Sequence, residues 1–330
     1  MVVRIGLLGA GRIGKIHGTN VAESRDAKLV AVADADENAA RTLAEAHGAE
    51  VRSADDIISS RDIDAVVIAT PTDTHADLIE RAAGVKKAVF CEKPVDLSSG
   101  RILSCLKVVE AAGIPLMIGF NRRFDPNFAS LKRRLDDGAV GKVEMVTIIS
   151  RDPGPPPVSY IKVSGGLYRD MMIHDFDLAR FLLGEEPIEV HAVGSVMVDP
   201  EIGKAGDVDT AMVMLRTASG KLCQISNSRR ATYGYDQRIE VHGSEGMIRA
   251  GNIHETTVEI ANKSGFKADP ILNFFLERYM PAYRAELAAF VAAIDKGTAP
   301  TPSGRDGLMA QRLADAATES KATGQTVKLG

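Results

Sequence analysis

The sequence has few cysteines, no long apolar run and no excess of basic charge, and each absence excludes a class of protein. Its three cysteines, Cys91, Cys105 and Cys223, form no CxxC pair and are odd in number. A disulfide framework or a zinc site is therefore not expected, and a reducing cytoplasm is. No apolar run approaches the ~20 residues that span a bilayer. The net charge of −4 argues against a nucleic-acid partner, which requires a basic surface.

The N-terminus also bears on location. Its first residues enter an apolar strand directly, without the basic segment and small-residue cleavage site of a signal peptide. We therefore expect a cytoplasmic protein. A chain of 330 residues, 45% apolar and 25% charged, is typical of a globular protein with two domains of ~100–200 residues each. The rhythm of the sequence changes after residue 120, so we expect domains at residues 1–120 and 121–330.

A glycine-rich loop near the N-terminus predicts a dinucleotide site. Gly9-Ala-Gly-Arg-Ile-Gly14 follows the apolar strand Val2–Leu8 and precedes a helical pattern. In such a loop the first glycine makes a tight turn, the second admits a pyrophosphate, and the third lets the helix pack close to the strand. Three glycines at this spacing are common in ordinary turns. The strand before the loop and the helix after it are the context that a dinucleotide site requires.

Asp34 follows the second strand, Lys28–Ala33, and lies twenty residues after Gly14. A carboxylate there accepts hydrogen bonds from the adenosine ribose and repels a 2′-phosphate, and no arginine follows it. NAD is therefore favoured over NADP. The alternative is a helix cap, the role that Asp36 is expected to have for the helix Glu37–His47.

Strands and helices continue to alternate to residue 120, which predicts a doubly wound parallel sheet, the Rossmann arrangement, in an α/β domain. Ligands bind such sheets at the carboxyl ends of the strands. Three segments leave strands there: Thr70-Pro-Thr-Asp-Thr-His75, Glu92-Lys-Pro94 and Asn121-Arg-Arg-Phe-Asp125. Pro94 forces an extended or turn geometry on Lys93, or a cis peptide bond. Either would hold the ammonium near a nicotinamide ring, although most lysines in loops are simply solvated.

The remaining residues predict an α+β domain. Alternating runs with hairpin-length connections indicate an open, largely antiparallel sheet, with one helix, Gly166–Leu183, over one face. The other face needs a cover, and a second subunit is expected to supply it. The C-terminus is helical and is expected to pack back on the first domain.

The stretch Gly165–Gly184 contains Asp170 and His174, four residues apart, which on a helix places both side chains on one face. A carboxylate beside an imidazole sets the tautomer and basicity of the histidine. By spacing alone, an ordinary surface pair is the more common case. A second polar cluster, Arg229–Arg238, suits either a hydroxyl-rich ligand or a polar subunit interface, and the sequence does not choose.

Five segments in order make the chain resemble the glucose–fructose oxidoreductase / inositol dehydrogenase (Gfo/Idh/MocA) family over nearly its whole length. They are Gly9–Gly14, Ala69-Thr-Pro-Thr-Asp-Thr-His75, Phe90-Cys-Glu-Lys-Pro94, Gly119-Phe-Asn-Arg-Arg-Phe-Asp125 and Gly165–Leu183. The resemblance implies that Lys93 contacts the reacting hydroxyl, that Asp170 orients the substrate, and that His174 is the general base. It also implies homotetramers assembled through the open sheet.

The resemblance implies oxidation of a ring hydroxyl of a cyclic polyol to a ketone, with NAD as cofactor and myo-inositol as the expected substrate. The alternatives are a sugar dehydrogenase and a non-catalytic dinucleotide-binding sensor. No metal is required, and no residue cluster suggests one. The roles of Asp175 and Asp177 on the same helix stay open, with simple polar residues as one interpretation. The expected cofactor contacts are Gly9, Gly11, Arg12, Ile13, Gly14, Asp34, Thr70, Pro71, Thr72, His75, Glu92 and Lys93, and the expected substrate contacts are Arg123, Asp152, Asp170, His174 and Tyr235.

Overall fold

The computed structural model describes residues 1–330 and divides them into two compact units. The first unit comprises Met1–Phe124 and Pro281–Gln311, and the second comprises Asp125–Met280 and Arg312–Gly330. Two C-terminal helices, α11 (Phe275–Lys296) and α12 (Gly304–Thr323), each contribute residues to both units. The C-terminal segment 281–311 therefore belongs to the same unit as the N-terminal residues.

A six-stranded parallel sheet forms the centre of the first unit and confirms the predicted doubly wound arrangement. Its strand order is β3-β2-β1-β4-β5-β6, and every neighbouring pair is parallel. All four residues of β4 and the first four of β5 are buried, as expected for strands covered by helices on both faces. The strands are β1 (Val3–Leu8), β2 (Ala27–Ala33), β3 (Glu50–Val51), β4 (Ala65–Ile68), β5 (Ala88–Glu92) and β6 (Leu116–Gly119).

Three helices of this unit start at a residue whose side chain caps them. Asp36 accepts hydrogen bonds from the amides of Asn38 and Ala39 at the start of α2, which confirms its predicted capping role. On one side of the sheet, Leu287, Phe290 and Val291 of α11 join the core formed by β1, β2, α1 and α2. The helices are α1 (Arg12–Glu23), α2 (Glu37–His47), α3 (Ala54–Ser59), η1 (Thr72–Thr74), α4 (His75–Gly84), α5 (Ser99–Ala112) and η2 (Asn121–Phe124).

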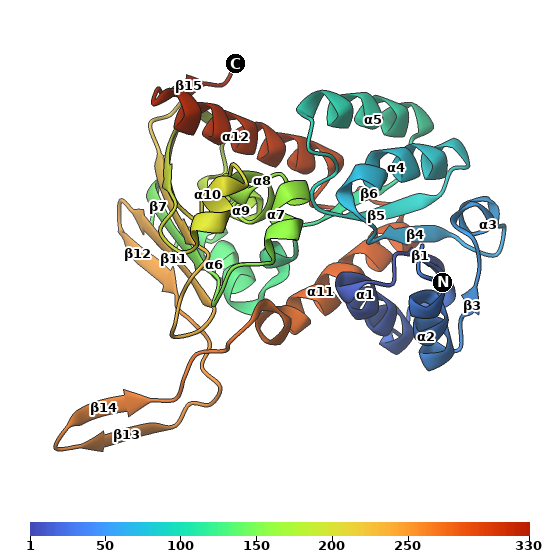
Figure 1. Cartoon of the computed structure of the whole chain (residues 1–330), viewed down its shortest axis with the longest axis horizontal. Coiled ribbons are helices and arrows are strands. Elements are labelled where there is room, and N and C mark those ends of the chain that lie inside the picture. The colour runs from blue at the N-terminus through green and yellow to red at the C-terminus, as the bar shows by residue number, and fades with distance from the viewer. The chain divides into compact units, whose positions relative to one another are not determined.

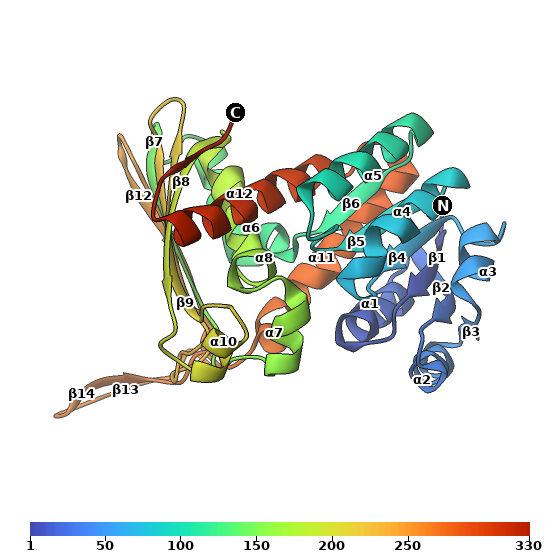
Figure 2. The ribbon, with the colours of Figure 1, turned by 45° about the horizontal axis from the view of Figure 1, so that its top comes forward.

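The second unit contains a seven-stranded sheet in the order β12-β11-β7-β10-β9-β8-β15. Its pairs are antiparallel except β7 with β10, which run parallel. Figure 2 shows this sheet edge-on, with helices of the same unit along one face only. The strands are β7 (Val143–Arg151), β8 (Pro187–Ser195), β9 (Thr210–Thr217), β10 (Leu222–Ser228), β11 (Asp236–Gly243), β12 (Gly246–Ala250) and β15 (Val327–Lys328). The prediction of an open, largely antiparallel sheet is confirmed.

The helix predicted over the sheet of the second unit is interrupted in the structure. The expected continuous helix Gly166–Leu183 is two helices, α8 (Leu167–Asp170) and α9 (Ile173–Leu183), separated by a turn at Met171 and Met172. The other helices are α6 (Pro126–Asp136), α7 (Val158–Ser164) and α10 (Pro200–Lys204). A hairpin of β13 (Glu259–Asn262) and β14 (Gly265–Ala268) projects from the sheet, and all eight residues of its strands are exposed (Figure 1).

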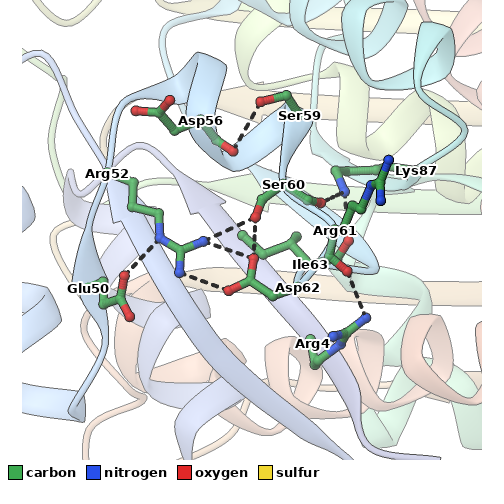
Figure 3. Close-up of polar contacts among 10 residues, drawn as sticks. All are labelled: Arg4, Glu50, Arg52, Asp56, Ser59, Ser60, Arg61, Asp62, Ile63 and Lys87. Carbon is green, nitrogen blue, oxygen red and sulfur yellow. Dashed lines mark hydrogen bonds and ion pairs between the residues drawn. The ribbon is translucent and has the colours of Figure 1, made fainter.

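A group of charged residues surrounds the loop between α3 and β4 (Figure 3). Arg52 contacts Asp62 with two nitrogens, at 2.9 and 2.8 Å, and Arg4 pairs with Asp64 at 2.7 Å. The arginine partners lower the pKa of Asp62 and of Asp64 below the ordinary carboxyl range. Lys87 donates from Nζ to the carbonyls of Ser60 and Ile63, each at 2.6 Å, and burial lowers its pKa. These contacts tie the loop to the start of the sheet.

The Asp64 pair should contribute stability in a pH-dependent way. Because the pKa of Asp64 is lowered in the folded state, its contribution is complete above the unfolded value near ~4 and is lost as pH falls through the lower folded value. Asp64→Asn should therefore destabilise the protein by about 1 kcal/mol at pH 7, and the difference should vanish in acid. Thermal unfolding of both proteins across this pH range measures it, with exposed Asp73→Asn as control. An equal loss at pH 7 and pH 2 would contradict the assignment.

Candidate active site

The glycine loop has the geometry of an anion cradle. Gly9 has φ +102°, and a Cβ there would lie 2.4 Å from the carbonyl oxygen of Ala69 at the end of β4. A Cβ on Gly14 would lie 2.0 Å from the carbonyl oxygen of Gly9, so α1 packs closely against the loop. A Cβ on Gly11 would meet nothing within 4 Å, and no side chain caps the first turn of α1. The exposed amides of this turn and the open space above Gly11 fit a pyrophosphate.

Asp34 lies beside this loop at the end of β2. Its Oδ2 accepts a hydrogen bond from the amide of Ala10 at 2.5 Å, and its Oδ1 accepts one from the amide of Asp36 at 2.8 Å. The N-cap of α2 is Asp36 and not Asp34. The capping alternative for Asp34 is therefore wrong, and its carboxylate is held against the glycine loop, where a ribose contact remains our prediction.

The ends of β4 and β5 carry the other residues expected at the cofactor. Thr70 and Thr72 are half-buried and Pro71 is exposed, whereas His75 is buried beneath them. The ring nitrogens of His75 both contact backbone carbonyls, Nδ1 that of Pro94 and Nε2 that of Thr70, each at 2.8 Å. The Lys93–Pro94 peptide bond is cis. His75 thus lies under the predicted contact surface and orders the segments that form it.

Glu92 and Arg123, two further residues of the first unit that are expected at the site, each have a protein partner. Oε1 of Glu92 lies 2.7 Å from Nε2 of His17, and Lys93 itself is half-buried. Arg123, expected to contact substrate, donates from Nη2 to Asp306 of α12 at 2.9 Å and is mostly buried. A contact of Arg123 with substrate remains a prediction, and any such contact shares the guanidinium with Asp306.

In the second unit, Asp170 is surrounded by groups that the sequence did not indicate. Oδ1 of Asp170 accepts a hydrogen bond from the hydroxyl of Tyr160 on α7 at 2.9 Å. Nη2 of Arg229 lies 3.6 Å from Oδ2 of Asp170 and 3.9 Å from Oδ2 of Asp207, and Arg229 is 1% exposed. Arg229 belongs to the polar cluster singled out above, but nothing in the sequence indicated its burial. Tyr160 follows a proline-rich loop, and nothing in the sequence indicated that it would contact Asp170.

His174 is the second residue of α9, half-buried, and Asp170 is the last residue of α8. A turn at Met171 and Met172 lies between them, so the two residues belong to separate helices.

Other predicted residues of this unit lie in varied surroundings. Asp152 follows β7, and its amide donates to the carbonyl of Ser228 at 3.0 Å. Tyr235 is 6% exposed, and its ring meets Tyr279 edge-on at a centroid distance of 5.8 Å. The substrate roles of Asp152 and Tyr235 stay predictions.

Asp175 and Asp177, whose roles the sequence leaves open, are buried in the structure. They are 0% and 1% exposed. Asp175 accepts a hydrogen bond from Nδ2 of Asn227 at 2.9 Å, and Asp177 lies 3.6 Å from Nη1 of Arg180. α9 is buried on nearly all sides, so carboxylates on it require polar partners in the interior.

The structure holds no group of three or more His, Cys, Asp or Glu side chains placed to bind a metal ion. It also has no helix with the length and apolar character needed to cross a membrane.

The two glycines flanking Ile13 and Arg12 should respond differently to substitution. Gly11→Ala should leave the thermal midpoint unchanged, because φ −69° and ψ −166° suit alanine and its Cβ meets no atom. It should weaken NAD binding by at least about tenfold, or ~1.4 kcal/mol, because the methyl group occupies space for the pyrophosphate. Gly14→Ala should lower the thermal midpoint. Calorimetric titration with NAD and thermal unfolding test both, and unchanged NAD affinity in Gly11→Ala would place the pyrophosphate elsewhere.

Comparison with known proteins agrees with this geometry. Residues 3–120 match the model of an oxidoreductase family with an NAD-binding Rossmann fold, and residues 128–249 match the Gfo/Idh/MocA C-terminal domain. An inositol 2-dehydrogenase of Rhizobium meliloti (strain 1021) is 58% identical over 329 residues, covering 100% of each chain. A myo-inositol 2-dehydrogenase of Thermotoga maritima is 48% identical, covering 99% of this chain and 98% of the other.

A solved structure extends the comparison to bound ligands. The scyllo-inositol dehydrogenase from Lactobacillus casei, with bound cofactor NAD(H) and scyllo-inositol, superposes with a TM-score of 0.92. It is 31% identical in sequence and covers 99% of each chain. The motif resemblance, the two family matches and the fold agree: the chain belongs to the Gfo/Idh/MocA family of oxidoreductases, with residues 3–120 as its NAD-binding Rossmann domain.

Proposed function

We propose that this protein oxidises a ring hydroxyl of a cyclic polyol to a ketone with NAD, and that myo-inositol, oxidised at position 2, is its substrate. The observation that carries the proposal is the full-length similarity to inositol 2-dehydrogenases. It is supported by the glycine cradle, by Lys93 at the end of β5 in the same unit, and by an Asp170 carboxylate held in a polar setting.

NAD, when bound, accepts the hydride that leaves the oxidised carbon. The protein must supply a proton acceptor and a positive charge beside the developing alkoxide. His174 takes the hydroxyl proton, and the ammonium of Lys93 stabilises the negative charge on the oxygen. Asp170 accepts a hydrogen bond from the substrate, while Tyr160 and Arg229 hold its carboxylate in place. The Asp34 carboxylate beside the glycine loop favours NAD over NADP, because a 2′-phosphate there would be repelled.

The open face of the second sheet supports a homotetramer. Six apolar side chains, which we call the methionine face, are each between 39% and 54% exposed: Met145, Val193, Met212, Met214, Leu222 and Met247. Leu222 pairs with Met145, and Met212 pairs with Val193, so these residues share one side of the sheet. A contiguous apolar patch of this kind is characteristic of protein interfaces. We propose that a second copy of the chain covers it.

We further propose that the enzyme acts in the cytoplasm, in the catabolism of inositol. All three cysteines are free and buried, which suits a reducing compartment. Oxidation of a ring hydroxyl to a ketone also activates the neighbouring carbons of the ring for later steps.

The substrate assignment predicts a clear order of rates. Reduction of NAD, followed by nicotinamide absorbance, should be faster with myo-inositol than with the other inositols tested or with glucose. His174→Ala should lower kcat by about 10²–10⁴-fold, the usual contribution of a general base, and should leave NAD binding intact. A glucose rate far above every inositol rate would refute the substrate, and unchanged turnover in His174→Ala would refute the base.

Charge on the methionine face should disrupt assembly. The double variant Met212→Glu/Met214→Glu should reduce the mass measured by light scattering from that of a tetramer to that of a smaller species. Burying the two unpaired carboxylates at a subunit interface would cost too much free energy. Met197→Glu, at a 67% exposed position outside the strands, is the matched control. A tetramer that persists in the double variant would show that this face is not the interface.

A further inference from the structure

The residues on both sides of Lys93 are held by buried histidines. Glu92, which precedes it, contacts His17 of α1, and Pro94, which follows it, contacts His75 of α4. Both histidines are essentially inaccessible, with 0% and 1% of their surface exposed. Neither lies where it would meet a substrate, and all of these residues belong to the first unit.

The contact of His17 is specified by its surroundings. Its Nε2 lies 2.7 Å from Oε1 of Glu92, and a carboxylate oxygen only accepts, so Nε2 donates. Its Nδ1 is buried and has no hydrogen-bond partner, and its ring meets Phe90 and Tyr283 edge-on at centroid distances of 4.9 and 5.8 Å. This environment fixes the ring and aims one N–H at Glu92.

Glu92 is confined on its other side by Gly119. A Cβ on Gly119 would lie 2.9 Å from Oε2 of Glu92. A side chain at this place on β6 would therefore require the Glu92 carboxylate to move. One carboxylate oxygen of Glu92 is thus directed at His17, and the other lies close to Gly119.

His75 connects two loops. Its Nδ1 is 2.8 Å from the carbonyl oxygen of Pro94, and its Nε2 is 2.8 Å from that of Thr70. Carbonyl oxygens only accept, so both contacts are hydrogen bonds when both ring nitrogens carry protons, and a singly protonated ring keeps one of them. The segment after β4 and the segment after β5 are therefore joined through one buried ring.

We propose that His17 and His75 are positioning residues that fix Lys93 and couple its placement to the segments that bind the cofactor. His17 lies on the helix whose first turn follows the glycine cradle, and His75 holds the carbonyl just before Pro71. A shift of either segment is therefore transmitted to a residue adjacent to Lys93. The catalytic role of Lys93 rests on the proposed function, but its placement by the two histidines does not.

The test compares variants that remove the hydrogen bonds with variants that keep them. His17→Phe and His75→Phe keep an aromatic ring and remove both nitrogens, whereas His17→Gln keeps an N–H that can reach Glu92. Two measurements are independent of turnover: the Kd for NAD by calorimetry, and the ¹³C signal of reductively methylated Lys93, assigned with Lys93→Arg. His17→Phe and His75→Phe should shift this signal and raise the NAD Kd about tenfold, as expected for loss of one hydrogen bond to a charged or buried group. His17→Gln should restore both readouts toward those of the unsubstituted protein.

Two controls separate positioning from general destabilisation. Val89→Ala removes buried volume from β5 without touching a histidine contact, and His47→Gln alters a half-buried histidine of α2. Both should leave the Lys93 signal and the NAD Kd unchanged. If His17→Phe does not fold, the Lys93 signal and the NAD Kd of His75→Phe and His17→Gln still test the proposal.

The proposal is overturned if the Phe variants match Val89→Ala in both readouts. It is also overturned if His17→Gln behaves as His17→Phe does, because the hydrogen bond would then be irrelevant. In active protein, the positioning role further predicts that kcat falls by up to about 10²-fold in His75→Phe, the cost of a small misplacement of a reacting group. Absence of inositol oxidation in the unsubstituted protein would refute the proposed function alone, since the Lys93 signal does not depend on it.

Discussion

The close packing of the Gly9–Gly14 loop against the end of β4 is the constraint on which the cofactor-binding part of the molecule depends. Gly9 and Gly14 have no room for a side chain, and Gly11 has open space above it. The close packing at Gly9 and Gly14 fixes where α1 begins. The open space at Gly11 leaves the first amides of α1 available to an anion. The same packing fixes the course of α1, so that His17, one turn further along, reaches Glu92 at the end of β5. The lack of room for a side chain at Gly9 and Gly14 thereby helps to order the ends of β4 and β5.

The parallel sheet, its helices and the family could be predicted because their signals are local. Buried strands are continuous apolar runs, and the glycine loop has a fixed spacing between a strand and a helix. The structure added what depends on distant partners. The parallel pairing of β7 with β10 joins residues more than seventy positions apart, and no hairpin-length pattern indicates it. The turn at Met171 and Met172 interrupts a stretch whose periodicity is helical throughout.

The sequence identifies candidate site residues by type and position, but it does not show their environment. Lys93 and Asp34 follow strands, and that is visible in the sequence. The burial of Arg229 beneath Asp170, and of Asp175 and Asp177 within α9, is set by the packing of the second unit. A charged residue in a sequence is expected at the surface, because an isolated buried charge is costly. These residues are exceptions because Asn227, Arg180 and the acidic pair around Arg229 supply partners.

In each unit, polar contacts from other elements order a candidate site residue or the residues beside it. In the first unit, α1 and α4 hold the residues on either side of Lys93. In the second, α7 and the strand end at Arg229 hold Asp170. A lysine on a flexible stem or a carboxylate in a turn would otherwise sample many positions, and proton transfer requires one. Hydrogen bonds to neighbouring backbone and side chains restrict that motion. The polar contacts of Glu92, Pro94 and Asp170 therefore limit the movement of two half-buried side chains, Lys93 and Asp170.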